Sequence, residues 1–246
     1  MFFLSPLEQF QILPYLTLNL FFLELPLYNN AFIALLGIFT FLLIYDISLN
    51  YMTNELSIVF EMIYEVISEM VFNNIGSKGQ MYFPFIITIF LFVLIINLIG
   101  LIPYSFTMTS HLCVTFALAF AIFIGINIIG IKTHGSHMLT LFLPSGTPLG
   151  LALLLVPIEI ASYFVKPISL SVRLFANMMA GHTLLKVIVG FAWSMFSIGG
   201  IMFLAHFIPI IILIILMGLE LGVAIIQAYV FTVLTCIYIN DAINLH

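Results

Sequence analysis

Charged and polar side chains stand inside apolar stretches of the second half of the sequence. Arg173 is the only arginine among 246 residues. A guanidinium keeps its proton, so Arg173 is a poor proton relay, but it can hold a nearby carboxylate in the charged form. Histidines and carboxylic acids exchange protons when burial and neighbours tune them. Titratable groups interrupted by one fixed charge therefore predict two partial proton paths separated by a barrier; the groups are Glu159, Lys166, Arg173, Asn177, His182, Lys186, His206, Glu220, Gln227 and Asp241.

Helical spacing places the groups around Arg173 on two surfaces. On an ideal helix, Glu159, Lys166 and Asn177 lie within about 40° of Arg173, on a face that also carries small residues. His182 points about 180° away. We expect the arginine and the histidine to serve different surfaces of one helix. The competing interpretation is that Arg173 and Glu159 only neutralise each other.

The last apolar stretch carries a second polar stripe. Glu220, Gln227 and Asp241 fall within a sector about 60° wide. Gly218 and Gly222 form a GxxxG pair on another face, which suits close helix packing. One side of this helix is therefore expected to pack while the stripe stays polar.

Other polar residues have simpler interpretations. Lys166 and Lys186 could snorkel or stabilise structure, and this alternative stays open. His134 and His137 have i,i+3 spacing, but without carboxylate or thiol support they are expected to be solvated loop residues and not metal ligands.

The elements that position these groups must be membrane helices. The chain is 64% hydrophobic and 6% charged, with a mean hydropathy of +1.31, which predicts a multi-span membrane protein. The runs are continuous and lack ten-residue alternation, so helices are favoured over a barrel. Cys113 and Cys236 are expected to be buried free thiols. Nucleic-acid binding has no basic patch to support it.

We predict one membrane domain over residues 1–246, of the all-α class. Its last part, 148–243, is expected to form a hairpin of two long, strongly tilted helices, because 148–194 alone would extend about 70 Å, against a hydrocarbon thickness of about 30 Å. Prolines at 157, 167 and 209 could bend these helices, and Gly199 and Gly200 lie at or near the turn. The preceding parts are an irregular lead-in, with room for a short helix, at 1–30, a first span at 31–50, an amphipathic helix at 53–73 and a helical hairpin at 81–131.

The amphipathic helix at 53–73 carries an acidic stripe. Glu61, Glu65 and Glu69 repel one another at i,i+4 spacing. A helix adsorbed on lipid normally presents Lys and Arg to the headgroups. We therefore expect this surface helix to contact protein, with lipid adsorption as the alternative.

Three segments of the sequence carry a resemblance to a known family. SLSVRLFANMMAGHTLL at 169–185, SPLEQF at 5–10 and NLIGLIPYSF at 97–106 resemble subunit a, or subunit 6, of the proton-translocating ATP synthases, in its mitochondrial form. The resemblance implies that Arg173 is the essential arginine facing the rotating c-ring, with Asn177 and Gln227 near it. It also implies a proton inlet at His182 and Glu220 with Asp241 near its mouth, and an outlet at Glu159.

By that resemblance, the chain moves protons through two offset half-channels at the c-ring, which couples the proton-motive force to rotation and ATP synthesis. It is not catalytic alone, since no P-loop is present, and no cofactor or metal is expected. The implied partners are the c-ring, peripheral-stalk subunit b, other membrane-sector subunits and the lipid bilayer; a dimeric complex stays open. The implied location is the mitochondrial inner membrane, with several spans.

Two other classes of function compete. A proton-coupled secondary transporter would show internal repeats of several spans, and no convincing repeat is found. A haem-holding redox subunit would pair histidines across spans, whereas the histidines here are scattered.

Overall fold

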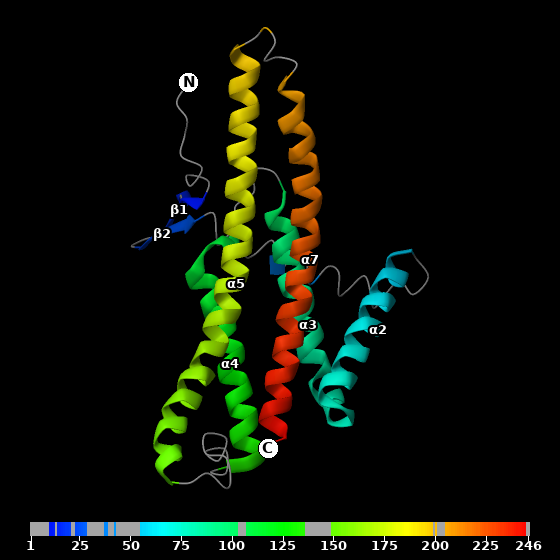
Figure 1. Ribbon diagram of the computed structural model, residues 1–246, viewed down its shortest axis with the longest axis vertical. Helices are drawn as coiled ribbons and strands as arrows, with labels where there is room; N and C mark the ends of the chain where they lie inside the picture. The colour runs from blue at the N-terminus through cyan, green and yellow to red at the C-terminus, as the bar shows by residue number, and fades with distance from the viewer. Residues whose placement is uncertain are drawn as a thin grey trace. The chain divides into compact units, whose positions relative to one another are not determined.

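A computed structural model of the chain describes residues 10–12, 14–20, 23–28, 37–38, 42, 55–102, 107–135, 149–198, 200 and 205–244. Helices dominate these residues (Figure 1). The predicted first span at 31–50 lies outside them except for residues 37, 38 and 42, which are helical.

Four described segments are long and apolar enough to cross a membrane. Such stretches form helices because a helix satisfies its backbone hydrogen bonds internally, without water. The corresponding helices are α3 (Phe83–Gly100), α4 (Leu112–His134), α5 (Leu149–Ile198) and α7 (Phe207–Ile243). The chain is thus a multi-pass membrane protein. Short 3-10 helices precede α3 and α4, η2 at Ser77–Tyr82 and η3 at Met108–Ser110.

The helix α5 stays continuous over 50 residues with Pro157 and Pro167 inside it. Gly200, after the end of α5, has φ 63°, a left-handed conformation that glycine adopts without a Cβ clash. Pro209 was expected to bend a helix, but it is the third residue of α7. The first N–H groups of a helix have no carbonyl partner within it, so a proline at this position breaks no hydrogen bond and requires no bend. The packing of α5 and α7 as a tilted hairpin stays a prediction.

The surface helix α2 (Glu55–Ile75) has one buried face. Met70 on this face contacts Cys236 of α7, with 3.7 Å between the two sulfur atoms. Cys236 is buried as expected, whereas Cys113 is exposed, so that part of the thiol prediction was wrong. The acidic side chains of α2 at 61, 65 and 69 are exposed. The buried residues of α2 are Ile67, Met70, Val71 and Ile75.

The lead-in contains a β-hairpin. Strand β1 (Pro14–Leu20) pairs antiparallel with β2 (Leu23–Tyr28), with Thr17 opposite Pro26. The expectation of an irregular lead-in with a short helix over 1–30 was therefore wrong for these residues. PYLTLNL alternates leucine with polar residues, which is the period of a strand and not of a helix. The all-α class holds for the membrane helices but not for this hairpin.

The chain divides into two compact units. The first comprises Met1–Tyr45, Phe92–His111 and Leu174–Ala228. The second comprises Asp46–Leu91, Leu112–Arg173 and Tyr229–His246. Helices α3, α5 and α7 are each divided between the two units, with one stretch in each. The polar residues of α5 and α7 therefore fall into two clusters, one in each unit.

Candidate functional site

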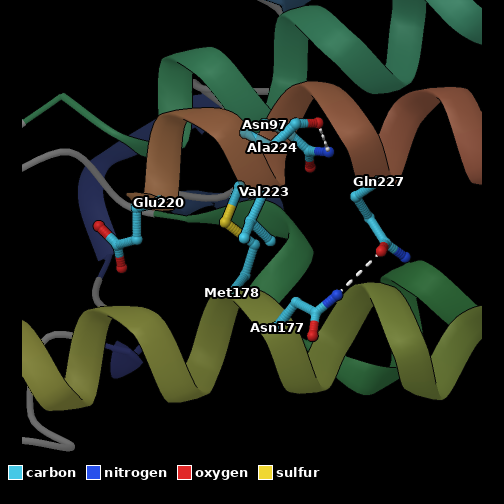
Figure 2. Close-up of a pocket in the computed structure, with 7 residues that line it drawn as sticks. All are labelled: Asn97, Asn177, Met178, Glu220, Val223, Ala224 and Gln227. Atoms are coloured by element: carbon cyan, nitrogen blue, oxygen red, sulfur yellow. Dashed lines mark hydrogen bonds between the residues drawn. The ribbon is translucent and has the colours of Figure 1, made fainter. Parts of the chain in front are cut away.

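Three helix segments of the first unit bring polar side chains around a small cavity. The cavity has a volume of about 10 Å³ and is shown in Figure 2. Asn97 reaches it from α3, Asn177 from α5, and Glu220 and Gln227 from α7. Three predicted site residues, Glu220 and Gln227 of α7 and Asn177 of α5, thus line the same cavity. The full lining is Asn97, Asn177, Met178, Glu220, Val223, Ala224 and Gln227.

A side-chain hydrogen bond joins α5 to α7 in this cluster. The Nδ2 atom of Asn177 donates to Oε1 of Gln227 at 2.8 Å (Figure 2). Gln227 is only 6% exposed, and its Nε2 is buried without a hydrogen-bond partner among the described residues. Asn177 and Gln227, both expected near Arg173, are thus hydrogen-bonded to each other, and the Nε2 donor of Gln227 is left without a partner among the described residues.

Glu220 lies against α5 at a position that only glycine allows. A Cβ atom built on Gly181 would lie 3.0 Å from Cδ and 3.1 Å from Cγ of Glu220. Carbon atoms in ordinary contact are about 3.5–4.0 Å apart, so Gly181 provides the space for this carboxyl group. The Oε1 atom of Glu220 is buried and lacks a hydrogen-bond partner among the described residues.

His182 follows Gly181 directly and is half-buried. Its ring hydrogen-bonds with the backbone of Gly100, at the end of α3, while its Nε2 atom is buried with no partner in the described part of the chain. A histidine on α5 and a carboxyl group on α7 thus each carry an unused polar atom. Both are groups that can take up and release a proton.

Asn97 is a site residue that the sequence analysis did not single out. It is 1% exposed, and its Nδ2 atom donates to the carbonyl oxygen of Ala224 at 3.5 Å. Its Oδ1 atom is buried with no partner among the described residues. The available signal was a lone amide inside the apolar run LFVLIINLIG, because buried polar groups in membrane helices tend to be functional.

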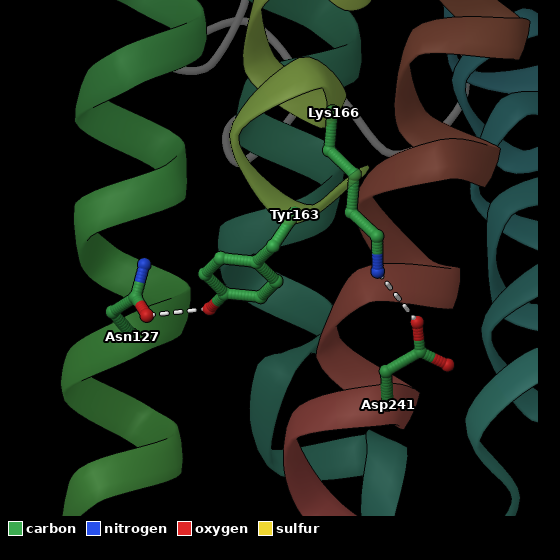
Figure 3. A network of polar contacts seen from close by, with 4 residues as sticks. All are labelled: Asn127, Tyr163, Lys166 and Asp241. Carbon is green, nitrogen blue, oxygen red and sulfur yellow. Dashed lines mark hydrogen bonds and ion pairs between the residues drawn. The ribbon is translucent and has the colours of Figure 1, made fainter. Parts of the chain in front are cut away.

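A second polar cluster lies in the other unit (Figure 3). The Nζ atom of Lys166 on α5 is 3.2 Å from Oδ2 of Asp241 near the end of α7. The same ammonium group lies 4.9 Å from the ring centre of Tyr238 and 5.6 Å from that of Tyr163. The hydroxyl of Tyr163 donates to Oδ1 of Asn127 on α4 at 2.5 Å. This network ties α4, α5 and α7 together.

Asp241 and Glu220 lie far apart along α7. Asp241 follows Glu220 by 21 residues, which is about 31 Å of helix, the thickness of a hydrocarbon core. The two carboxyl groups share an angular stripe but stand at different depths along the helix. Asp241 instead pairs with Lys166, which lies seven residues after Glu159 on α5.

Arg173 lies in the middle of α5 and is half-buried. Among the described residues, a salt bridge joins Lys166 to Asp241, and no carboxylate lies within 4.0 Å of the Arg173 guanidinium. Neutralisation of Arg173 by Glu159 therefore receives no support. Exposed small or polar residues lie beside Arg173 on α5, together with the exposed Val172; they are Ser169, Ala176, Asn177 and Ala180.

In the part of the chain that the structure describes, no cluster of three or more His, Cys, Asp or Glu side chains occurs. The Nε2 atom of His134 lies 2.8 Å from the carbonyl oxygen of Ile243, in the last turn of α7. His134 therefore satisfies one of the carbonyl groups that a helix end leaves unpaired. His137 lies outside the described residues.

The comparisons with known proteins all indicate the same family. The profile of the family "ATP synthase A chain" matches residues 29–240. The chain is 52% identical to the ATP synthase subunit a of Chondrus crispus over 247 residues, which covers 98% of this chain and 97% of the relative. It is 51% identical to that of Pylaiella littoralis over 246 residues, with 98% and 99% covered. For Marchantia polymorpha the identity is 49% over 249 residues, with 98% and 99% covered.

Proposed function

The chain belongs to the ATP synthase A chain family, a component of the membrane sector of ATP synthase, and from this premise we propose that it conducts protons through two offset half-channels beside a ring of c subunits. Proton flow through these paths turns the ring and drives ATP synthesis on other subunits. The observation that carries the proposal is the placement of Arg173, which is half-buried inside a membrane helix with no carboxylate of its own chain within salt-bridge distance among the described residues.

An unpaired guanidinium inside a membrane helix requires a partner. A charged side chain within the bilayer is costly, so it pairs with an opposite charge or meets water. The exposed small-residue face beside Arg173 lets another helix approach closely. A carboxylate carried by each c subunit supplies the charge. Arg173 favours the deprotonated form of that carboxylate as it passes and keeps a proton from crossing directly between the half-channels.

The inlet half-channel is formed by His182 and Glu220. Both carry a buried polar atom that no other described group satisfies, and both can take up and release a proton. The Asn177–Gln227 pair lies farther along the same helices, toward Arg173 on α5. A proton entering past Glu220 and His182 neutralises the next c-subunit carboxylate, which can then face lipid.

The outlet half-channel contains Glu159. We assign Asp241 to this side and not to the mouth of the inlet, because its carboxylate is bound to Lys166 and not placed at the depth of Glu220. Lys166 and Asp241 are 27% and 41% exposed, so this chain alone does not seal either side chain from a proton path. The ion pair would hold α5 and the end of α7 together beside the path by which protons leave.

The separation of the two paths is what allows work to be done. Each proton that crosses a membrane potential releases about 2.3 kcal/mol per 100 mV. This free energy can turn the rotor only when the direct route is closed, so that the proton must travel around with the ring. A fixed positive charge between the paths provides that closure.

The family and the helical spans make the chain a partner of other ATP synthase subunits in a membrane. We propose more specifically that these are the c-ring and the peripheral-stalk subunit b, and that the membrane is the mitochondrial inner membrane. The arrangement of histidine at 182 with glutamate at 220 resembles the mitochondrial members, which supports this location.

The test is replacement of Arg173 by Ala in the whole complex. We expect assembly to be retained, as judged by native electrophoresis, while proton-driven ATP synthesis in vesicles is lost. Lys132→Ala is the matched control, because it removes an exposed cation at the end of α4 without touching either cluster. ATP synthesis at the wild-type rate in the Arg173→Ala complex would overturn the proposal.

A further inference from the structure

The surface helix α2 has apolar side chains on two sides, and this chain covers one of them. Met70 is buried on the covered side, where it contacts Cys236 of α7. On the other side, Ile58, Met62 and Phe72 are 59%, 62% and 61% exposed. Large apolar side chains gathered on one face mark an interaction surface. The second side therefore lacks a cover among the described residues.

The exposed side has the spacing of a coiled-coil seam. Five residues follow one another at intervals of four, three, four and three positions, and we call them the seam: Ile58, Met62, Glu65, Glu69 and Phe72. On an ideal helix all five lie within about 40° of Ile58. This alternation keeps one row of side chains turned toward a partner helix, here over about 21 Å. The seam therefore fits a second helix of about 15 residues.

A lipid surface does not fit the seam. A helix adsorbed on a bilayer separates its apolar side from its polar side and presents Lys or Arg to the headgroups. In the seam, Glu65 and Glu69 stand between Met62 and Phe72 in one row. Burial of this row in acyl chains would take both carboxylates along with the apolar side chains, which is costly. A protein partner can instead place an opposite charge against each glutamate.

The glutamates of the seam require cations from outside the chain. The sequence of α2 contains no Lys or Arg, and neither Glu65 nor Glu69 forms a salt bridge in the part of the chain that the structure describes. Their spacing of four residues makes them repel each other. A second copy of this chain would oppose glutamate to glutamate and add to the repulsion. A basic helix would replace the repulsion by charge-assisted hydrogen bonds.

We propose that the seam of α2 binds a helix of another subunit, in which two Lys or Arg residues three or four positions apart lie between apolar residues. The cations face Glu65 and Glu69, and the apolar residues pack on the rest of the seam. None of the residues assigned to the proton path belongs to the seam, so this contact goes beyond the proposed function. Through Met70 and Cys236, it also attaches the last part of α7 to the neighbouring subunit.

The double variant Glu65→Gln, Glu69→Gln separates a docking surface from a solvated one. On a solvated surface the change only removes a repulsion, so every subunit should stay bound. On a docking surface it leaves two buried cations of the partner unpaired. We then expect the dissociation constant of one subunit to rise roughly 30-fold or more. Native mass spectrometry of the whole solubilised complex over a dilution series measures this loss.

The matched control is Glu61→Gln, which changes an exposed acid about 60° from the centre of the seam. Exposed ion pairs contribute little, so this variant should retain the subunit nearly as well as the wild type. Retention of every subunit at the wild-type level in the double variant would overturn the proposal.

Cross-linking of the assembled complex identifies the occupant without any substitution. Photo-methionine, a diazirine analogue, is incorporated in place of methionine and irradiated. We expect Met62 to cross-link to a helix of another subunit that carries the basic pair, and Met70 to cross-link to α7. Met81, which is 84% exposed and lies outside α2, is the control and should not give the same peptide. A Met62 that cross-links to lipid alone, to a second copy of this chain, to a helix without the basic pair or to nothing would refute the proposal.

Discussion

Gly181 offers the sharpest test of how Glu220 is positioned. In Gly181→Ala, the added Cβ would lie 3.0 Å from Cδ and 3.1 Å from Cγ of Glu220, with a carboxyl oxygen nearer still. Ordinary contacts between carbon atoms begin near 3.5 Å, so the carboxyl group must withdraw by about half an ångström or more. The atoms that clash are at the end of a flexible side chain, and the carboxyl group will therefore move before the backbone does.

The expected effects on stability and on transport differ in size. Overpacking costs about 1–3 kcal/mol, while alanine gains about 1 kcal/mol over glycine inside a helix, so the net loss of stability should be at most about 2 kcal/mol. A displacement of about 1 Å in a reacting group can lower a rate about 100-fold. We expect the rate of proton pumping to fall between tenfold and 100-fold in a complex that still assembles.

The assay is ATP-driven acidification of inverted vesicles, with Gly190→Ala as the matched control. Gly190 lies on the same helix, and a Cβ built there meets no atom within 4 Å in the described structure. The control gains the same helix propensity without moving Glu220, and its pumping should be normal. Shortening the acid to Glu220→Asp in the Gly181→Ala background should recover part of the activity. Equal pumping by the two glycine variants would refute the reasoning.

Two further predictions concern the second cluster and the loop before α4. A double-mutant cycle with Lys166→Ala and Asp241→Ala should give a coupling of about 0.2–1 kcal/mol, because both side chains are partly exposed; thermal unfolding measures it, and a coupling near zero would contradict the ion pair. Burial lowers the pKa of His111 below its usual 6.5, so the unfolded chain binds the proton first and stability is lost as the pH falls below 6.5. The melting temperature of His111→Gln should therefore decline less than that of the wild type from about pH 7.5 to about 5.5, and parallel declines would contradict this.

Helical periodicity was sufficient to predict which groups share a face of one helix. It placed Asn177 near Arg173 on α5, and the structure places Asn177 on the exposed side of that helix. An angular stripe does not give depth, because the rise of 1.5 Å per residue separates Asp241 from Glu220 by about 31 Å. Angle and depth have to be considered together in a long helix.

Contacts between helices could not be predicted from one sequence. Gly181 has no local signal that distinguishes it from the other helical glycines, since its role depends on a side chain 39 residues away on α7. Asn97 is likewise defined by its contact with Ala224. The β-hairpin was missed for a different reason. Leucine alternates with polar residues at 14–20, but Pro14 and Pro26 lack an N–H for a sheet and favoured an irregular segment.

The close approach of Gly181 and Glu220 also constrains how the family can diversify. A side chain at position 181 and a long acid at position 220 compete for the same volume. Across many homologous chains, the residue sizes at the two positions should therefore vary inversely. Lineages that lose the long acid at 220 would be free to admit alanine or serine at 181, and the order of those two substitutions in a phylogeny should be fixed.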